Sequence, residues 1–383
     1  MKQASLIMIG LSLLMFSVLA PQVKAFGITA YPWSMFHHDS MHTGFSLSPA
    51  PNVNSILWTF QTAGGIVGSP AVVDGKVFVG TENSLYAVDQ INGKLLWSRQ
   101  DIGSWWSSPA VDDGKVFICD FSNIYALKES DGSTVWSYPL DFFAYYSSPT
   151  VVGNLVFVGD IDGIYALNEK TGAKVWNYAL PDVFCSVAAA NGMIFAANLG
   201  PPCSLVALNM YTGHVVWSLS LDYGGSFVAS PAVADGRVFV SVLTGDLANG
   251  CVLALNQFNG HIIWRSMETG PIYSSPAVAY DKVFVGSDDN NTYAFHEKDG
   301  SLIWSYATGN IIEASSPAVA DNKVFIGSWD NYVYALDQHT GTLLWRLKTG
   351  GATGSPAIAD GVLYAGSLDG RLYAVGTHAH KRF

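Results

Sequence analysis

Four acidic residues recur at similar intervals in a chain that is poor in charge. They are Asp101, Asp141, Asp182 and Asp222, and each lies a few residues after a tryptophan. Aromatic residues follow them, namely Trp105, Trp106, Phe142, Phe143, Tyr145, Tyr146, Phe184, Tyr223 and Phe227, with Tyr273 just beyond. Aromatic faces stack on sugars, peptides and cationic groups, and carboxylates accept hydrogen bonds from such ligands. This pattern indicates a binding platform for a ligand of that kind.

A packing role would explain the same residues. Aromatic side chains can pack between neighbouring loops, and Asp residues often begin turns. Further acids occur at Asp120, Asp160, Asp162, Asp246, Asp288, Asp289, Asp330 and Asp369. None of these loops contains the spaced series of oxygen ligands of an EF-hand, so turn formation is favoured over a Ca²⁺ site.

Three histidines near the N-terminus, His37, His38 and His42, are possible metal ligands. Their segment is bounded by Pro32 and Gly44 and has no clear helix signal, so a structural strap that docks on the rest of the protein is favoured. No Ser-His-Asp ordering can be nominated, and the glycines lie in turns rather than in phosphate-binding loops. We therefore assign no catalytic residue and no metal site.

The elements that must position these residues come from a repeat. A Gly followed four residues later by a Trp occurs at Gly93/Trp97, Gly132/Trp136, Gly172/Trp176, Gly213/Trp217, Gly260/Trp264, Gly300/Trp304 and Gly341/Trp345. Upstream in each copy stand Ser-Pro-Ala-Val or a variant, a short turn, and an apolar run such as 77–80. Four short strands recurring every 38 to 47 residues predict the blades of a β-propeller.

The two ends of the repeat predict how the ring closes. The first strand occurs eight times, but the last copy ends after Leu372–Val375 without a fourth strand. Residues 56–60 have the pattern of that missing strand, including Trp58. We therefore expect an all-β, eight-bladed propeller of four-stranded antiparallel blades in which an N-terminal strand completes the last blade.

The eight repeat tryptophans are expected to be structural residues that pack between blades, because equivalent copies favour packing over ligand stacking. They are Trp58, Trp97, Trp136, Trp176, Trp217, Trp264, Trp304 and Trp345.

Pro cannot donate to a strand ladder, so the Ser-Pro strand should be the edge that faces the central channel. The residue after the Pro is Ala in most copies, and it is Thr150 in the third. Small side chains suit the crowded axis.

The N-terminus has the features of a secretory signal peptide in residues 1–25: Lys2, an apolar run from Leu6 to Ala20, and a small-residue end at Ala25. We divide the rest into a strap at 26–55, the propeller at 56–376 and a tail at 377–383. Removing the leader takes the net charge from −11 to −13, which disfavours nucleic acid and anionic membranes. We expect a secreted monomer, extracellular or periplasmic, without a membrane span.

Four cysteines in an exported protein predict disulfides. Cys185 and Cys203 fall in the fourth repeat, on one face, and are the preferred pair; a Cys203–Cys251 link between adjacent blades is the alternative. Cys119 and Cys251 fall on the second and fifth blades, too far apart to join.

The motifs resemble a known family. Ser-Ser-Pro-Ala-Val at 274–278, Val-Tyr-Ala-Leu-Asp at 333–337 and Thr-Gly-x-x-x-Trp at 340–345 are similar to the pyrroloquinoline quinone (PQQ)-type propeller repeat. That family contains quinoprotein dehydrogenases and the outer-membrane assembly lipoprotein BamB, and the resemblance covers 56–376. For the dehydrogenases it implies a quinone held against a Trp beneath a disulfide of neighbouring cysteines, with Ca²⁺ and a catalytic Asp. No two cysteines are adjacent here.

We expect an exported, non-enzymatic scaffold that binds a protein or a cell-surface glycan, with no cofactor. Its binding face should carry the loops that join the fourth strand of one blade to the first of the next (D–A loops) and the second strand to the third (B–C loops). The alternative is a small PQQ-dependent oxidoreductase that holds the quinone and Ca²⁺ in the funnel of that face.

Overall fold

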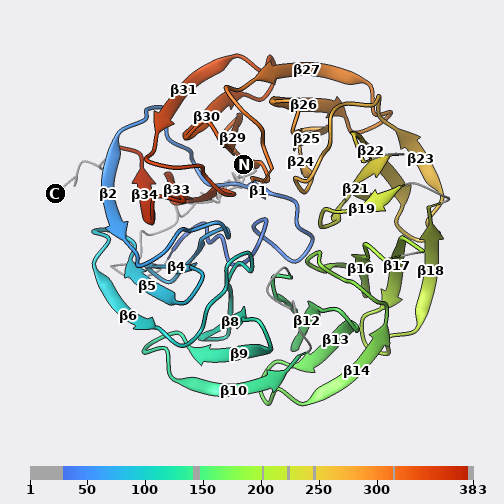
Figure 1. Cartoon of the computed structure of the whole chain (residues 1–383), viewed down its shortest axis with the longest axis horizontal. Coiled ribbons are helices and arrows are strands. Elements are labelled where there is room, and N and C mark those ends of the chain that lie inside the picture. The colour runs from blue at the N-terminus through green and yellow to red at the C-terminus, as the bar shows by residue number, and fades with distance from the viewer. Residues whose placement is uncertain are drawn as a thin grey trace, which may run out of the picture.

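Eight blades of four antiparallel strands each surround a central axis, which confirms the predicted propeller, and two of the sheets gain a short fifth strand (Figure 1). The computed structural model describes residues 29–140, 147–200, 202–221, 225–244, 247–313 and 315–377. No helix in these residues is long and apolar enough to cross a membrane. In each blade the strand that follows the Ser-Pro motif, or Ser186-Val187 in blade 4, is short, buried and innermost, and the Trp strand is outermost.

Blades 1 to 4 follow one another along the chain, each as an A-B-C-D meander. Their strands are β3 (Ala71–Val73), β4 (Lys76–Gly80), β5 (Leu85–Asp89), β6 (Leu95–Arg99); β7 (Ala110–Asp112), β8 (Lys115–Cys119), β9 (Asn123–Lys128), β10 (Thr134–Pro139); β11 (Thr150–Val152), β12 (Leu155–Gly159), β13 (Gly163–Asn168), β14 (Lys174–Ala179); and β15 (Ala188–Ala190), β16 (Met193–Ala197), β17 (Ser204–Asn209), β18 (Val215–Ser220).

Blades 5 to 7 continue the ring, and blade 5 has the longest B–C hairpin. Their strands are β20 (Ala232–Ala234), β21 (Arg237–Thr244), β22 (Asn249–Asn256), β23 (Ile262–Arg265); β24 (Ala277–Ala279), β25 (Lys282–Gly286), β26 (Asn291–His296), β27 (Leu302–Ala307); and β28 (Ala318–Ala320), β29 (Lys323–Ser328), β30 (Tyr332–Asp337), β31 (Leu343–Lys348). A short strand, β19 (Ser226–Phe227), also pairs with β21.

Blade 8 joins the two ends of the chain. It contains β32 (Ala357–Ala359), β33 (Val362–Gly366), β34 (Arg371–Val375) and, as its outer strand, β2 (Ile56–Gln61). β2 pairs antiparallel with β34, with Trp58 opposite Ala374. The predicted closure by the N-terminal strand is therefore confirmed, and it removes the open sheet edges of a linear array.

The repeat tryptophans lie on the outermost strands, and their side chains are turned inward. Seven of them are buried, namely Trp97, Trp136, Trp176, Trp217, Trp264, Trp304 and Trp345, while Trp58 of the closing strand is half-buried. Each ring contacts an aromatic residue of strand B in its own blade, at 5.7 to 5.9 Å between centroids, as Trp136 contacts Phe117 and Trp304 contacts Phe284.

The same eight tryptophans link each blade to the next. Each indole Nε1 donates to a backbone carbonyl beyond the blade boundary at 2.8 to 3.1 Å. The pairs are Trp58–Gln90, Trp97–Glu129, Trp136–Glu169, Trp176–Met210, Trp217–Gln257, Trp264–Glu297, Trp304–Gln338 and Trp345–Pro51. The turn glycine of the next blade lies against the indole ring: a Cβ on Gly93 would stand 2.5 Å from Trp58. Side chain and glycine are thus paired packing elements.

The segment before β2, the strap of residues 26–55, is described from residue 29 onward and crosses the channel (Figure 1). Its carbonyls accept hydrogen bonds from the inner strands of six blades, at 2.6 to 2.8 Å, through the N–H groups of Val72, Val111, Ala189, Val233, Val278 and Val319. Its last part forms β1 (Phe45–Ser46), which pairs in parallel with β28. The strap therefore pairs the inner strand edges that would otherwise face an empty channel.

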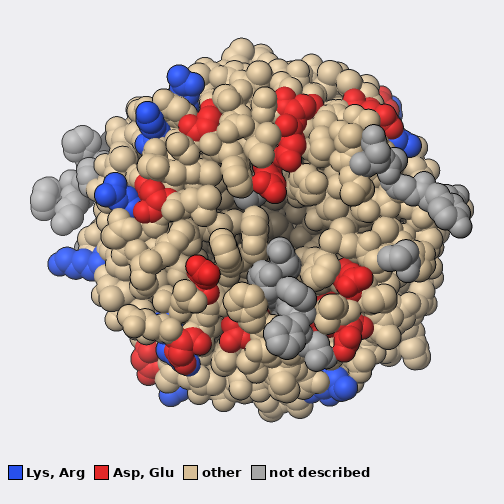
Figure 2. Space-filling model, viewed as in Figure 1, with Lys and Arg blue, Asp and Glu red and all other residues tan. Residues whose placement is uncertain are grey.

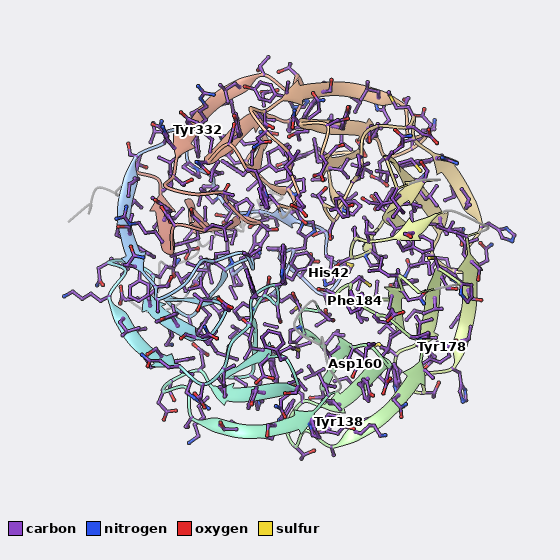
Figure 3. The ribbon with its side chains drawn as sticks, viewed as in Figure 1. His42, Tyr138, Asp160, Tyr178, Phe184 and Tyr332 are labelled. Carbon is purple, nitrogen blue, oxygen red and sulfur yellow. The ribbon has the colours of Figure 1, made fainter. Side chains whose placement is uncertain are left out.

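Two buried histidines, His37 and His42, anchor the strap, and His42 lies near the axis of the ring (Figure 3). His42 Nδ1–H donates to the Pro231 carbonyl at 3.2 Å, so its Nε2 is left to accept from the Thr150 hydroxyl, also at 3.2 Å. Burial lowers the pKa of His37 to about 4 and that of His42 to about 3, so both rings are neutral. The exceptional Thr150 of the third blade is explained by this contact.

Candidate functional site: the axial pocket and the adjoining groove

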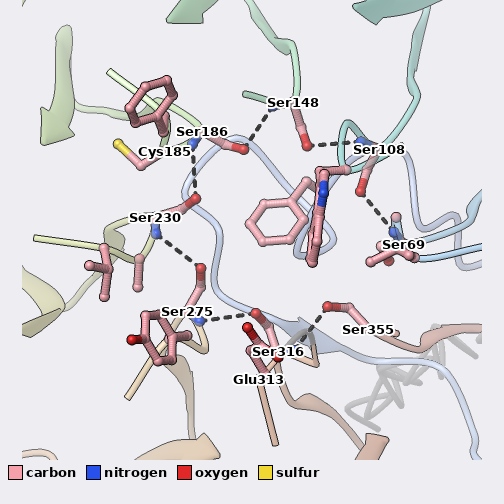
Figure 4. A pocket seen from close by; sticks show the side chains of 18 residues that line it. Ser69, Ser108, Ser148, Cys185, Ser186, Ser230, Ser275, Glu313, Ser316 and Ser355 are labelled. Carbon is pink, nitrogen blue, oxygen red and sulfur yellow. Dashed lines mark hydrogen bonds between the residues drawn. The ribbon is translucent and has the colours of Figure 1, made fainter. Parts of the chain in front are cut away.

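A belt of serines surrounds the axis above the strap. It consists of the residues that directly precede the inner-strand prolines, or Val187 in the fourth blade: Ser69, Ser108, Ser148, Ser186, Ser230, Ser275, Ser316 and Ser355 (Figure 4). In seven links of 2.8 to 3.0 Å, the hydroxyl oxygen of one serine accepts the backbone N–H of the corresponding serine in the preceding blade. The motif that identified the inner strands therefore also ties neighbouring blades together at the axis.

All eight serines of the belt line a pocket of about 310 Å³. The pocket opens on the face that carries the D–A and B–C loops, where the space-filling view is hollowed at its centre (Figure 2). Phe36 of the strap lines it beneath the belt, stacked on His37 at 4.9 Å between ring centroids and edge-on to His42 at 5.3 Å. The strap thus forms part of the pocket wall.

Three of the predicted platform aromatics line this pocket. Trp106, Phe184 and Tyr273 reach it from three different D–A loops, which lie after β6, β14 and β23. Glu313, from the D–A loop after β27, is the one acidic residue among the described lining residues, and these include no Lys or Arg. Glu313 is not among the residues predicted from the sequence.

Asp288 lies beside this acidic part of the pocket. Its pKa is raised to about 6, first by burial and then by the negative charges of Glu313 and Asp289. The pKa of Tyr273 is likewise raised, first by burial and then by Asp288 and Glu313. The buried Oδ1 of Asp288 has no hydrogen-bond partner among the described residues. Two carboxyl groups, those of Asp288 and Glu313, thus lie close together on one side of the pocket, and its described lining contains no Lys or Arg to balance them.

Other B–C acids have structural roles. In blades 6 to 8 an Asp accepts from the backbone N–H of a D–A glycine at 2.8 to 2.9 Å and from the hydroxyl of a tyrosine on strand C; these are Asp289, Asp330 and Asp369. Asp120 and Asp160 accept backbone N–H groups within their own turns. No group of three or more potential ligands for a metal occurs in the part of the chain that the structure describes.

An apolar groove of about 110 Å³ adjoins the pocket. Trp105 and Trp106 form one side, and Trp329 and Leu368 from the B–C loops of blades 7 and 8 contribute to the lining. Trp105, Trp329 and Leu368 keep 38%, 39% and 44% of their surface exposed, respectively. Trp106 and Val67 line both cavities, so the groove and the pocket are neighbours that share a wall.

The repeat tryptophans take no part in either cavity. Neither the pocket nor the groove is lined by Trp58, Trp97, Trp136, Trp176, Trp217, Trp264, Trp304 or Trp345. Their indole N–H groups are engaged between blades, and seven of the eight side chains are buried. The tryptophans that face the site are those outside the repeat motif, in the loops.

Trp329 and Leu368 were missed by sequence analysis, although alignment of the repeats contains their signal. Blades 6 to 8 share a B–C loop of the form Gly-Ser-x-Asp, and the variable position is Asp288, Trp329 or Leu368. The shared Gly, Ser and Asp form the turn, so the residue at the third position can differ between blades and face the site.

Several predicted site residues lie elsewhere. Asp101 is exposed and forms a two-contact ion pair with Arg99, whose hydrogen bonds lower the pKa of that carboxyl. Phe227 is buried in β19 and belongs to the core, so its prediction as a binding residue is wrong. Asp182 lies beside Gly200 and does not line the pocket. Asp141, Tyr145, Tyr146 and Asp222 lie outside the described residues, as does Asp246.

Neither predicted disulfide is present, because all four cysteines are free. Cys185 Sγ instead donates to the Ala197 carbonyl at 3.1 Å and accepts from its N–H at 3.2 Å. Ser274 makes the same pair of contacts with Gly286 in blade 6. The thiol therefore replaces a serine hydroxyl of the repeat, and Cys203 bonds separately to the Leu199 carbonyl.

Comparison with known proteins agrees with this architecture. A family model described as outer membrane protein assembly factor BamB matches residues 51–107, 85–182, 164–247 and 248–379. The outer membrane protein assembly factor BamB of Yersinia pestis is 28% identical over 114 residues, which are 28% of this chain and 27% of that protein. This match thus spans about a quarter of the relative's length.

Two solved structures share the fold. BamB from Moraxella catarrhalis superposes with a TM-score of 0.70 at 18% identity, covering 86% of this chain and all of that one (100%). A europium-containing methanol dehydrogenase superposes with a TM-score of 0.71 at 13% identity, covering 91% and 98%. Identities this low establish common architecture and leave activity to the site.

Proposed function

Because this chain belongs to the family of the outer membrane protein assembly factor BamB, a family of PQQ-type propellers, we propose that it is an exported, non-enzymatic scaffold that binds a polypeptide. The binding surface is the D–A/B–C face, and the contact is made chiefly in the apolar groove. The leader-like pattern of residues 1–25 supports export. The names of the relatives support a role in protein assembly.

The groove is the observation that carries this proposal. Three tryptophans from two distant parts of the chain converge there, with Leu368 and Ile66 beside them. Two of the tryptophans are more than one-third exposed. Trp is enriched among the residues that dominate protein interfaces, and exposed apolar clusters mark such sites. An extended segment with alternating apolar side chains can place one of them in a groove of this size.

The pocket does not fit the quinone of the alternative function. PQQ carries three carboxylates, and the described lining offers Glu313 and no Lys or Arg to balance them. A buried carboxylate without a partner is costly, and like charges at close range add to that cost. The cysteines of the chain are separated by at least 17 other residues, so none can form the neighbouring pair that the dehydrogenase resemblance implies.

A fluorescence anisotropy titration tests the polypeptide-binding role. The probe is a labelled decapeptide in which Phe alternates with Thr, and its all-Thr counterpart is the control peptide. We expect binding of the first peptide only, and Trp329→Ala should weaken it by at least tenfold, as for an interface hot spot. Tyr211→Ala is the matched control, because Tyr211 is exposed on the opposite, hairpin face.

Equal weakening by both variants, or no preference for the Phe peptide, would contradict the proposal. A β-glucan hexasaccharide provides the glycan arm of the same experiment. Saturable binding of the sugar that is abolished by Trp329→Ala, without peptide binding, would identify the face as a glycan site instead.

A further inference from the structure

We propose that the axial pocket is a site for an organic cation, that is, a positively charged nitrogen on an apolar stem. This goes beyond the groove's role in binding a polypeptide, because it concerns a separate cavity with its own chemistry. The ligand class includes quaternary ammonium compounds and the side chains of Lys and Arg, which share this chemistry.

The walls of the pocket are suited to a cation. Trp106, Phe184 and Tyr273 line it on the D–A side, and Phe36 lines it from the strap. An aromatic face attracts a cation through its quadrupole, and the attraction is strongest where water is excluded. Four aromatic rings from four separate segments around one cavity of about 310 Å³ provide such faces in several directions.

The negative charge of the pocket favours a positively charged ligand. Glu313 lies in the pocket lining (Figure 4) and forms no hydrogen bond or ion pair with any described residue. Asp288 adds a second carboxyl group close enough for the Glu313 charge to raise its pKa. On this face Lys and Arg lie toward the outer rim, while acidic side chains approach the central hollow (Figure 2). A cation would supply the missing counter-charge.

The serine belt can complete the coordination. Each hydroxyl oxygen in the seven observed links accepts one backbone N–H, and a hydroxyl oxygen has two acceptor lone pairs. The hydroxyl of Ser69, which also lines the pocket, is buried and has no hydrogen-bond partner among the described residues. The primary ammonium of Lys or the guanidinium of Arg can therefore donate to the belt, whereas an anion would meet Glu313 and no described basic group.

The shared wall links this site to the groove. Trp106 and Val67 line both cavities. A polypeptide whose apolar side chain occupies the groove can therefore place a neighbouring Lys or Arg in the pocket. A free ammonium compound would use the pocket alone.

Isothermal titration calorimetry of the full chain with choline tests the site directly. The matched neutral probe is 3,3-dimethyl-1-butanol, which has nearly the shape of choline without its charge. We expect choline to bind at least tenfold more tightly than the neutral probe. Glu313→Gln should weaken choline at least tenfold, and Trp106→Leu should weaken it similarly by removing an aromatic wall.

Glu82→Gln is the charge control. Glu82 is exposed in the B–C loop of blade 1 and does not line the pocket, so its loss removes one negative charge from the same face without altering the cavity. We expect less than a twofold effect. Equal affinity of choline and its neutral analogue, or equal effects of Glu313→Gln and Glu82→Gln, would overturn the cation site. Circular dichroism of each variant verifies that the propeller is folded.

A second arm distinguishes the two sources of the cation. The Phe/Thr decapeptide is made with one central Thr replaced by Arg or by citrulline, its neutral isostere. Tenfold preference for Arg that requires Glu313 indicates a polypeptide side chain. If choline binds but the two peptides do not differ, the cation is a free small molecule. If neither choline nor Arg is preferred while Trp329→Ala still weakens the peptide, the cation site is refuted and the groove proposal stands.

Discussion

The indole nitrogen of Trp345 donates to the carbonyl oxygen of Pro51 at 3.1 Å, although 294 positions separate the two residues in the chain. At the other seven joints the acceptor lies in the hairpin turn between strands C and D of the next blade. Blade 8 has no such turn, because its outer strand comes from the N-terminus. Pro51 thus replaces the missing turn.

The turn glycines at these joints give a first prediction. Gly93 has a φ of +68°, and a Cβ there would stand 2.5 Å from the Trp58 ring. Gly93→Ala should therefore cost left-handed backbone strain of about 1 kcal/mol and a further ~2 kcal/mol for displacing the indole. Gly114→Ala is the control, since Gly114 has a φ of +69° and nothing within 4 Å. Urea denaturation measures both; equal losses would disprove the packing role.

Thr150 gives a second prediction, because its hydroxyl is the described donor to His42 Nε2. Thr150→Val keeps the volume but leaves a buried acceptor without its donor, which should cost about 1–3 kcal/mol of unfolding free energy. Thr150→Ser keeps the hydroxyl and loses one methyl group, for about 0.8 kcal/mol. A Val variant as stable as the Ser variant in thermal or urea unfolding would show that the hydrogen bond contributes nothing.

The strap histidines predict a pH dependence of stability. Burial lowers the pKa of His37 to about 4 and of His42 to about 3, against an ordinary value of 6.5. The unfolded chain therefore binds more protons below pH 6.5, and stability falls as the pH decreases from there toward 4. Each histidine should account for a loss of about 2 kcal/mol between pH 7 and 5, at about 1.4 kcal/mol per pH unit.

Two variants test whether the strap histidines cause this dependence of the unfolding free energy on pH. His42→Gln should reduce the dependence of unfolding free energy on pH, whatever its effect on stability at pH 7. His261→Gln, in an exposed turn of the hairpin face, should leave the slope unchanged. A wild-type protein with constant stability from pH 7 to 5 would contradict the neutral, buried state of the strap histidines.

Asp288 and Asp289 are adjacent but should respond oppositely to neutralisation. The pKa of Asp288 is raised to about 6, so the folded state loses stability as pH rises from 3.8 through 6. Asp288→Asn should therefore stabilise the protein at pH 8, by on the order of 1 kcal/mol because the group is partly solvated, and give no gain at pH 4. Thermal unfolding at both pH values measures this.

Asp289 is the matched case. Burial opposes its ionisation, but hydrogen bonds from Gly270 N–H, Tyr293 and Asn291 lower the pKa of this carboxyl overall. Asp289→Asn should lower stability at pH 8. If Asp288→Asn also destabilised at pH 8, Asp288 would have to be a structural residue rather than part of an uncompensated acidic site.

The ring could be predicted from the sequence because the repeat is regular. The site was difficult to predict because its residues lie at the variable positions of the loops. Fixed spacing of Gly and Trp implies equivalent joints, so blade number and closure followed from the positions of Trp58 and Val375. The loops carry no such constraint. Phe227 and Trp106 are both aromatic residues that follow a Trp strand and precede the next inner strand. Pairing of β19 with β21 buries Phe227, whereas Trp106 lines the pocket.

Cys185 shows a further limit of sequence reasoning. The sequence predicts a disulfide partner for this cysteine, but its position within the repeat determines its role, and the thiol is free. Its thiol meets the same backbone need that Ser274 meets in blade 6. An alignment of the blades places Cys185 at the position that Ser274 occupies in blade 6, and this indicates that the thiol replaces a hydroxyl group.

The strap has a consequence for the order in which the molecule is completed. Trp33 and Gly44 emerge early in synthesis, but the amide of Val319 that binds Gly44 is made roughly 275 residues later. At about 5–20 residues per second, the strap waits tens of seconds for its last partner. The earliest part of the described chain to leave the ribosome is therefore among the last to be buried, and the ring can close only after nearly the whole propeller has been made.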